Sequence, residues 1–275
     1  LANTSKSAWV SSAKIRAKDQ EQIYEAVFDG MLSKLDAFSR YSGAEEASRN
    51  RERRDGFGGV GLRFKIHNSN AQVTDIIPNT PADFAGIKVG DEIIYVGQIP
   101  IQGLQSRHIK KQLRGPIGSD VKLTLKRKQS KVNIVVNIMR ERVVSPSVDT
   151  RISGHTGIIK ITTFNQGTSS SVDEAIKTLT KNKKITSLII DLRGNPGGLL
   201  RQAVKVADLL LSEGVIVTTR GRHVDSLRAY KAKSNVISPD IPLAILLDGR
   251  SASAAEIVAA ALQDQGRAIL IGSTS

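Results

Sequence analysis

The pattern of apolar and polar positions divides the chain into three parts, of which the first is helical. Residues 8–39 carry apolar side chains at helical spacing and acidic side chains on the opposite side, which predicts one or two amphipathic helices. The apolar positions include Ile23, Val27, Met31, Leu32 and Leu35, and the acidic positions are Asp19, Glu21 and Glu25. The charge-rich stretch 40–55 indicates a loop or a frayed helix. We therefore expect an N-terminal helical segment over residues 1–54.

The second part, residues 55–142, consists of short alternating runs separated by turns. This pattern predicts a compact, mostly β domain with two short helices. Strands are expected at residues 62–66, 72–76, 92–96, 121–127 and 132–139, and a helix at residues 106–113.

Six residues near the start of this domain, Gly56-Phe57-Gly58-Gly59-Val60-Gly61, match the dinucleotide-binding pattern G-x-G-x-x-G. Such a loop needs a strand before it and a helix after it. Here a charge run precedes the glycines and an extended, alternating stretch follows them. The context therefore excludes a dinucleotide site at this loop.

The third part, residues 143–275, alternates between strand and helix patterns from about Gly154 onward. This alternation predicts an α/β layered core. Strands are expected at residues 157–163, 187–192, 215–219, 243–247 and 268–271, and helices at residues 169–181, 199–211 and 254–263.

Two junctions between a strand and a helix in this core are candidate sites. At the first, the turn Asp248-Gly249-Arg250 leads through Ser251-Ala252-Ser253 into a nearly all-apolar helix. A helix N-terminus favours negative charge, so a serine there is a candidate nucleophile, although serine is also a common N-cap without chemistry. At the second junction, the turn Asn195-Pro196-Gly197-Gly198 frees N–H groups that suit an oxyanion hole, although a purely structural turn would have the same sequence.

Composition narrows the classes of function. No apolar run approaches the ~20 residues that span a bilayer, and the polar first residues are not a signal peptide, so we expect a protein that is cytosolic or is given without its targeting sequence. The absence of cysteine excludes disulfides, thiol catalysis and thiolate metal sites. The net charge of +14 would suit a nucleic-acid partner. However, the charge is spread along the chain and only 4% of the residues are aromatic, and both features argue against nucleic-acid binding.

A series of motifs in residues 55–142 resembles a PDZ domain of the bacterial, protease-associated type. The motifs are Gly59-Val60-Gly61-Leu62, Thr80-Pro81-Ala82, Ala85-Gly86-Ile87, Gly90-Asp91-Glu92-Ile93-Ile94 and Leu113-Arg114-Gly115. Consecutive backbone N–H groups at Val60, Gly61 and Leu62 can form a nest for a terminal carboxylate, and the strand that they open can accept a peptide by β-augmentation. The alternative is that these glycines only shape a hairpin.

Arg114 stands at the end of the helix that would flank the peptide groove. In relatives, the matching arginine looks like a link between the position of the PDZ domain and the alignment of the active site, which suits the reach and fixed charge of arginine. The alternative is that Arg114 caps the C-terminus of its own helix.

Together with residues 191–198, the motifs at 251–256 and 261–268 resemble the carboxy-terminal processing proteases, which are serine peptidases with a PDZ domain. The resemblance extends from about Glu25 to the last residue, and it implies a crotonase-like protease core built of ββα units. It also implies that Ser253 is the nucleophile and that Gly197 or Gly198, together with the amide of Ala254, donates to the oxyanion. Ser251 is the alternative nucleophile. The resemblance implies no cofactor and no metal.

The family places its base, a lysine, about 25 residues after the serine, in the motif Thr-Phe-Gly-Lys. That position falls beyond Ser275, so we expect the core to be incomplete at this end and the 275 residues alone not to cleave peptides. An alternative Ser–His–Asp site would use His155 or His223 with Asp191 or Asp248.

The resemblance therefore implies a serine endopeptidase that cleaves proteins near an apolar C-terminal tail held by the PDZ domain. It also implies a location in the bacterial periplasm or cell envelope, an adaptor protein as a partner, and a homo-oligomer formed through the N-terminal helices. Two other functions are consistent with the same motifs. One is a non-catalytic PDZ scaffold that binds tails, and the other is a crotonase-like acyl-CoA enzyme, which would leave the PDZ domain without a role.

Overall fold

The computed structural model describes residues 10–13, 17–35, 39–128, 130–181, 184–233, 236–237 and 240–275, and it divides into two units, Leu1–Arg53 and Arg54–Ser275. In the first unit, helix α3 (Gln20–Leu32) begins after Asp19, whose side chain accepts a hydrogen bond from the backbone N–H of Gln22 (2.8 Å). This helix confirms the central part of the predicted helical stretch. Residues 8, 9, 14–16 and 36–38 of that stretch lie outside the described residues.

The charge-rich stretch, for which a loop or a frayed helix was expected, forms helix α4 (Ala44–Asp55). Its sequence lacks an apolar stripe, and the helix buries none of its residues. Arg49 and Glu45 form an i,i+4 ion pair (3.1 Å) on its surface, and pairs of this spacing stabilise a helix without a core face.

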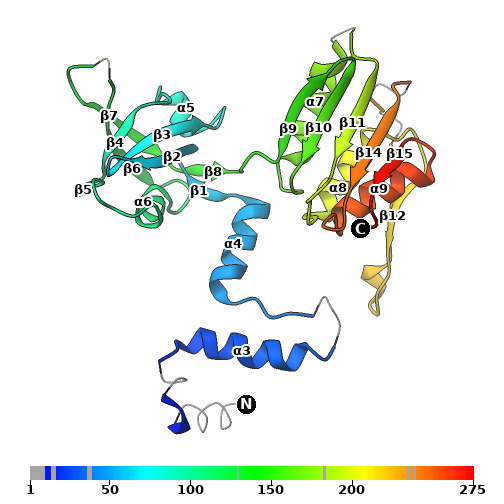
Figure 1. The fold of residues 1–275 in the computed structure, drawn as a ribbon, viewed down its shortest axis with the longest axis horizontal. Coiled ribbons are helices and arrows are strands. Elements are labelled where there is room, and N and C mark those ends of the chain that lie inside the picture. The colour runs from blue at the N-terminus through cyan, green and yellow to red at the C-terminus, as the bar shows by residue number, and fades with distance from the viewer. Residues whose placement is uncertain are drawn as a thin grey trace. The chain divides into compact units, whose positions relative to one another are not determined.

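A six-stranded antiparallel sheet follows, with the order β2-β3-β4-β6-β7 and with β5 paired to β4 (Figure 1). Its strands are β2 (Leu62–His67), β3 (Asn70–Ile76), β4 (Glu92–Val96), β5 (Ile99–Pro100), β6 (Asp120–Lys126) and β7 (Ile134–Met139), and its helices are α5 (Pro81–Phe84) and α6 (Ser106–Leu113). The expected mostly β domain with two short helices is confirmed. β7 begins two residues later than expected, because the Ser130 hydroxyl donates to the carbonyl of Val132 (2.7 Å) in a turn.

The glycine-rich stretch before β2 contains a strand that the sequence pattern did not indicate. Strand β1 (Phe57–Gly59) pairs antiparallel with β8 (Glu141–Val143), so the two ends of the β domain lie side by side. A strand rather than a helix follows Gly61, which agrees with the exclusion of a dinucleotide loop.

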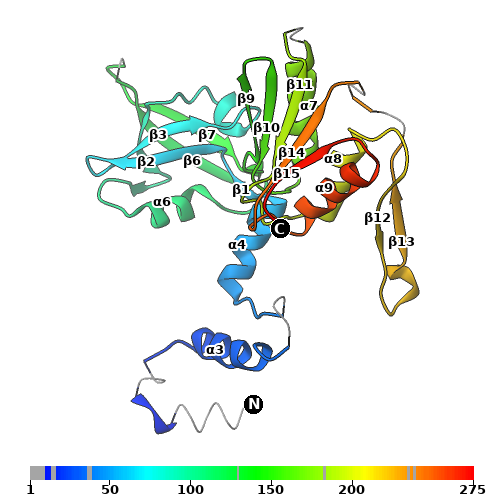
Figure 2. The ribbon, with the colours of Figure 1, turned by 45° about the vertical axis from the view of Figure 1, so that its right-hand side comes forward.

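The core is a five-stranded sheet with the order β15-β14-β11-β10-β9. Its strands are β9 (Val148–Ser153), β10 (Thr156–Ile161), β11 (Ser187–Asp191), β14 (Leu243–Leu247) and β15 (Ile269–Gly272), and its helices are α7 (Thr168–Lys181), α8 (Leu200–Asp208) and α9 (Ala254–Asp264). β10, β11, β14 and β15 are parallel, and β9 is antiparallel to β10. β10, β11, β14 and β15 are neighbours in the sheet in the same order as in the sequence. Connections between parallel strands are right-handed, so this order places α7, α8 and α9 on one face of the sheet, as Figure 2 shows.

One detail corrects the expected sheet, and a second concerns its edge. The segment expected as a core strand at 215–219 is β12 (Val215–Thr219), but it pairs with β13 (Arg228–Lys231) in a separate hairpin. β15 is an edge strand of the core sheet, with Ile269 64% and Ile271 50% exposed. Among the described residues, no helix is long and apolar enough to cross a membrane.

Candidate active site

Three loops follow the carboxyl ends of the parallel strands β10, β11 and β14 and meet at one edge of the core sheet. They are residues 162–168, 192–198 and 248–253. The backbone N–H of Phe164 donates to the carbonyl of Gly197 (2.9 Å), which joins the first loop to the second. The N–H of Ala252 donates to the carbonyl of Asn195 (3.0 Å), which joins the third loop to the second. The residues expected to form the active site therefore come together.

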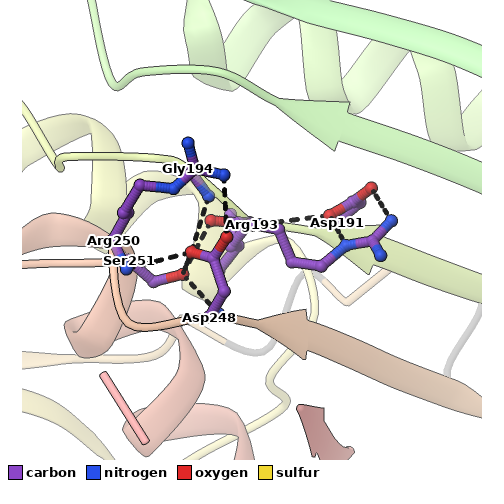
Figure 3. Close-up of polar contacts among 7 residues, drawn as sticks. Asp191, Arg193, Gly194, Asp248, Arg250 and Ser251 are labelled. Atoms are coloured by element: carbon purple, nitrogen blue, oxygen red, sulfur yellow. Dashed lines mark hydrogen bonds and ion pairs between the residues drawn. The ribbon is translucent and has the colours of Figure 1, made fainter. Parts of the chain in front are cut away.

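The second and third loops are also joined by side chains, as Figure 3 shows. The carboxylate of Asp248 accepts from the backbone N–H of Gly194 (2.8 Å), and the Ser251 hydroxyl donates to the carbonyl of Leu192 (2.9 Å). The hydrogen bond from Gly194, followed by those from Arg250, lowers the pKa of Asp248 to about 2. Asp248 is therefore a charged structural residue of the turn at neutral pH.

Asn195 fixes the glycine turn from inside the protein. Its side chain is fully buried; Nδ2 donates to the carbonyl of Ile161 (2.8 Å), and Oδ1 accepts from the N–H of Gly197 (2.8 Å). The sequence interpretation singled out the glycines and missed this residue. A signal was present, because a polar amide next to Pro-Gly-Gly offers both a donor and an acceptor to the turn.

The two serines of the third loop have different environments. Ser251 is 2% exposed, and its oxygen also accepts from the backbone N–H of Asp248 (3.0 Å), so its hydroxyl is held inside the turn. Ser253 is exposed at the N-cap of α9 with φ 55°, an uncommon conformation for a residue with a side chain. Its N–H donates to Oε2 of Glu256 (2.6 Å). Of the two serines, Ser253 is therefore the one that a substrate can reach.

The amides around Ser253 differ in their availability. The Gly197 N–H is bonded to Asn195, whereas the N–H groups of Gly198 and Ala254 have no acceptor among the described residues. A side chain at Gly197 would place Cβ 2.8 Å from Cβ of Ser253 and 2.9 Å from the nitrogen of Ala254, so the turn packs directly against the serine. This geometry favours Gly198 over Gly197 as an oxyanion donor.

The structure places His155 away from Ser253. His155 precedes β10, and its ring nitrogen Nδ1 contacts the carbonyl of Lys184 (2.9 Å), at the start of the parallel strands. Ser253 follows the carboxyl end of β14. The five residues of such a strand separate these two edges by roughly 16 Å.

The other members of the alternative triad are also engaged elsewhere. His223 is exposed beside Asp225, with Nδ1 and Oδ2 3.4 Å apart. Asp191 forms an ion pair with Arg193 (2.8 Å), and this hydrogen-bonded partner lowers the pKa of Asp191. The described contacts do not bring a histidine to Asp191 or Asp248. Nor does any group of three His, Cys, Asp or Glu side chains in the described part of the chain form a candidate metal site.

The β domain has a cavity of about 330 Å³ at its edge strand. It is lined by Phe57, Gly59, Val60, Gly61, Leu62, Arg63, Phe64, Ile77, Lys110, Leu113, Arg114, Val143 and Ser145. Ile77 N–H donates to the carbonyl of Gly61 (2.9 Å), which makes Leu62 and Ile76 a non-hydrogen-bonded pair. The N–H of Leu62 therefore points away from β3, toward the open edge and the cavity.

Arg114 lines this cavity, with its guanidinium carbon 4.1 Å from the ring centroid of Phe57. The carbonyls at the end of α6 are engaged by another residue. Arg140 donates to the carbonyls of Gln112 (2.9 Å) and Leu113 (3.2 Å). Arg140 thus contributes to capping this helix end, and Arg114, the C-cap residue, also joins α6 to β1 through the aromatic ring.

The close packing of Gly197 generates a first prediction. We expect Gly197→Ala to lower the free energy of unfolding by about 1 to 3 kcal/mol more than Gly194→Ala, because the new methyl group overlaps Ser253 and Ala254. Gly194 also has a positive φ (73°), but its nearest neighbour would lie 3.7 Å away, so it controls for backbone strain. Urea unfolding of both variants measures the difference. Equal losses of unfolding free energy in the two variants would show that backbone strain alone explains the need for glycine at position 197.

A second prediction concerns the pH dependence of the Asp248 turn. Since the pKa of Asp248 falls from its ordinary value of 3.8 to about 2 on folding, its contribution to stability is complete above pH 4 and is lost as the pH falls toward 2. Asp248→Asn should therefore be less stable than the parent protein at pH 6, and this deficit should shrink at pH 3. Thermal unfolding across this range measures it. A deficit that stays constant with pH would contradict the role of the charge.

Comparison with known proteins gives two family matches on this chain. Residues 58–138 match the PDZ domain family, and residues 155–275 match peptidase family S41. A carboxy-terminal-processing protease from Bartonella bacilliformis is 36% identical over 270 residues, which cover 97% of this chain and 62% of that protein. A probable CtpA-like serine protease from Staphylococcus aureus is 31% identical over 268 residues, which cover 96% of this chain and 53% of that protein.

Among solved structures, the photosystem II D1 C-terminal processing protease is similar at 26% identity, over 92% of this chain and 70% of that one, with a TM-score of 0.46. The chain spans between about half and three fifths of the length of the two bacterial relatives. The expected PDZ domain and the expected α/β protease core are both confirmed. The chain thus combines a PDZ domain with a region of peptidase family S41, and over nearly its whole length it is similar to carboxy-terminal processing proteases.

Proposed function

We propose that this chain carries the tail-binding groove and the nucleophile of a serine endopeptidase that cleaves proteins near their C-terminal tails. The observation that carries the proposal is the exposed Ser253 at the N-terminus of α9, packed against the Gly197 turn. We assign residues 1–54 to an N-terminal helical segment, residues 55–142 to the PDZ domain and residues 143–275 to the protease core.

The proposed reaction is amide hydrolysis through an acyl-enzyme. The Ser253 oxygen attacks the scissile carbonyl carbon while its proton passes to a base, and the amides of Ala254 and Gly198 stabilise the oxyanion. The base then protonates the leaving amine as the C–N bond breaks. Water attacks the acyl ester, and its proton returns to the Ser253 oxygen by way of the base. We assign the base to a lysine at the family's position, beyond the residues of this sequence, where burial would keep its amine neutral.

Capture of the tail is supported by the open edge of β2. An extended peptide can pair with this edge strand, its terminal carboxylate accepting from the amides of Val60, Gly61 and Leu62. Gly61 has φ 88°, and a side chain there would overlap Thr80, so the loop requires glycine at this position. Leu62, Phe64 and Leu113 give the cavity an apolar lining, which suits a tail with apolar residues at its end.

The family also suggests a setting for this activity. We place the protein in the bacterial periplasm or cell envelope, with an adaptor protein as a further partner, and we assign formation of a homo-oligomer to the N-terminal helices. The exposed Met31 on α3 supports the last assignment, because an apolar stripe without a buried residue is suited to contact another chain.

The third prediction tests the nucleophile. In the full-length protein, Ser253→Ala should abolish cleavage of a substrate with an apolar tail and leave the melting temperature nearly unchanged, because the exposed hydroxyl is removed without a cavity. Ser251→Ala is the matched control, and it should lower the melting temperature because the buried bonds to Leu192 and Asp248 are lost. Cleavage that survives Ser253→Ala would move the nucleophile elsewhere. Tail binding without cleavage in the parent protein would favour the scaffold function.

The fourth prediction tests tail capture. A peptide that ends in small apolar residues with a free carboxylate should bind at least tenfold more tightly than its C-terminal amide, because the amides of the loop after β1 lose their anion. Fluorescence anisotropy with the two labelled peptides measures the ratio. Equal affinities would overturn the carboxylate site.

A further inference from the structure

We propose that the tail-binding groove selects tails with an acidic residue at the third position from the end, and that Lys110 reads this residue. The inference rests on the proposed capture of a C-terminal tail and names the class of tail. Three cations line the cavity, Arg63, Lys110 and Arg114. They are not equivalent.

Two of the cations already have partners in the domain. Arg63 lies 3.6 Å from the carboxylate of Asp75, its neighbour on β3. Arg114 stacks on the ring of Phe57. Lys110 is exposed on α6, and its ammonium group has no partner among the described residues. A ligand can therefore pair with Lys110 without breaking an existing contact, which is not so for Arg63 and Arg114.

The direction of a bound tail follows from the loop that receives its carboxylate. That loop opens β2, so a peptide whose last residue lies there must extend along β2 from Leu62 toward Ile66, antiparallel to it. Side chains of an extended peptide alternate between two faces, and each residue advances by about 3.4 Å. The last and the third residues from the end therefore face the same wall of the groove, about 7 Å apart.

Helix α6 forms that wall, and its orientation places Lys110 at the third residue. The N–H of Gly115 donates to the carbonyl of Gly58 (3.1 Å), so the C-terminal end of α6 lies beside the strand that precedes the carboxylate loop. Leu113 is thus next to the last residue of the tail. Lys110 is three residues earlier, about 4.5 Å further along the helix axis, and its long side chain covers the remaining distance.

The experiment measures affinities for three labelled peptides that differ only at the third position from the end, which is Glu, Gln or Lys. The protein is the full chain with Ser253→Ala, so that the peptides are not cleaved. At low salt we expect the Glu peptide to bind about three- to fivefold more tightly than the Gln peptide, as for a partly exposed ion pair, and the Lys peptide to bind most weakly. High salt should reduce these ratios.

Variants of α6 then assign the preference to one residue. Lys110→Gln should bring the Glu to Gln ratio close to one while the Gln peptide binds as before. Lys111→Gln is the matched control, because Lys111 is the exposed neighbour on the same helix and does not line the cavity, and it should keep the ratio. Lys110→Glu should reverse the order and favour the Lys peptide, which loss of folding cannot do.

The outcomes separate this inference from the function on which it rests. Equal binding of the Glu and Gln peptides, when both still require a free carboxylate, would overturn the role of Lys110 and leave tail capture intact. Equal losses in Lys110→Gln and Lys111→Gln would also overturn it, since the preference would then come from the diffuse charge of α6. Binding that does not depend on the free carboxylate would overturn tail capture itself.

Discussion

The candidate site depends on one buried side chain, the amide of Asn195. Its Nδ2 group is bonded to the carbonyl of Ile161 at the end of β10, and its Oδ1 atom to the N–H of Gly197, while its backbone carbonyl accepts from Ala252 in the loop after β14. One residue therefore connects its own loop to the end of β10 and to the loop after β14. A fully buried amide with a donor and an acceptor both satisfied is costly to disturb, because any shift of the turn would leave one of these groups unpaired.

This arrangement also explains why one of two serines so close in sequence is buried and the other is exposed. The turn after β14 is closed by Ser251, whose oxygen accepts from the N–H of Asp248 and whose hydroxyl donates to the carbonyl of Leu192. Once that turn is closed, the chain must reverse sharply to begin α9, and the positive φ of Ser253 makes this reversal. The reversal leaves the Ser253 side chain exposed at the helix N-terminus, beside the N–H of Ala254, which has no acceptor in the described part of the chain. Strain at one residue and burial of the other are two results of the same turn.

The sequence predicted what depends on local patterns, and it missed what depends on distant partners. Helix α9 and strand β14 follow from the periodicity of their apolar residues, and Ser253 was ranked above Ser251 by resemblance to the family. Strand β1 has only three residues, two of them glycine, and its partner β8 lies more than 80 positions further along the chain, so no periodicity reveals it. The capping of α6 by Arg140 and the choice between the amides of Gly197 and Gly198 likewise depend on side chains placed by the fold.

The loop after β10 shows how the two domains are joined near this site. Gln166 donates its N–H to the carbonyl of Arg54 (3.0 Å), where the chain approaches the PDZ domain, and Asn165 donates Nδ2 to the carbonyl of Ser145 (2.8 Å), where the chain leaves it. Between them and the core, Phe164 is paired with the turn at Gly198.

The loop after β10 is thus bonded to the chain just before and just after the PDZ domain, and it also holds one side of the turn that contains Gly198. A continuous set of hydrogen bonds is not yet a coupling, since coupling requires two arrangements whose balance both sites shift. It does define where such a coupling would have to act. A displacement of the PDZ domain that moved Arg54 or Ser145 would have to break these bonds or move Phe164, and moving Phe164 would move Gly198.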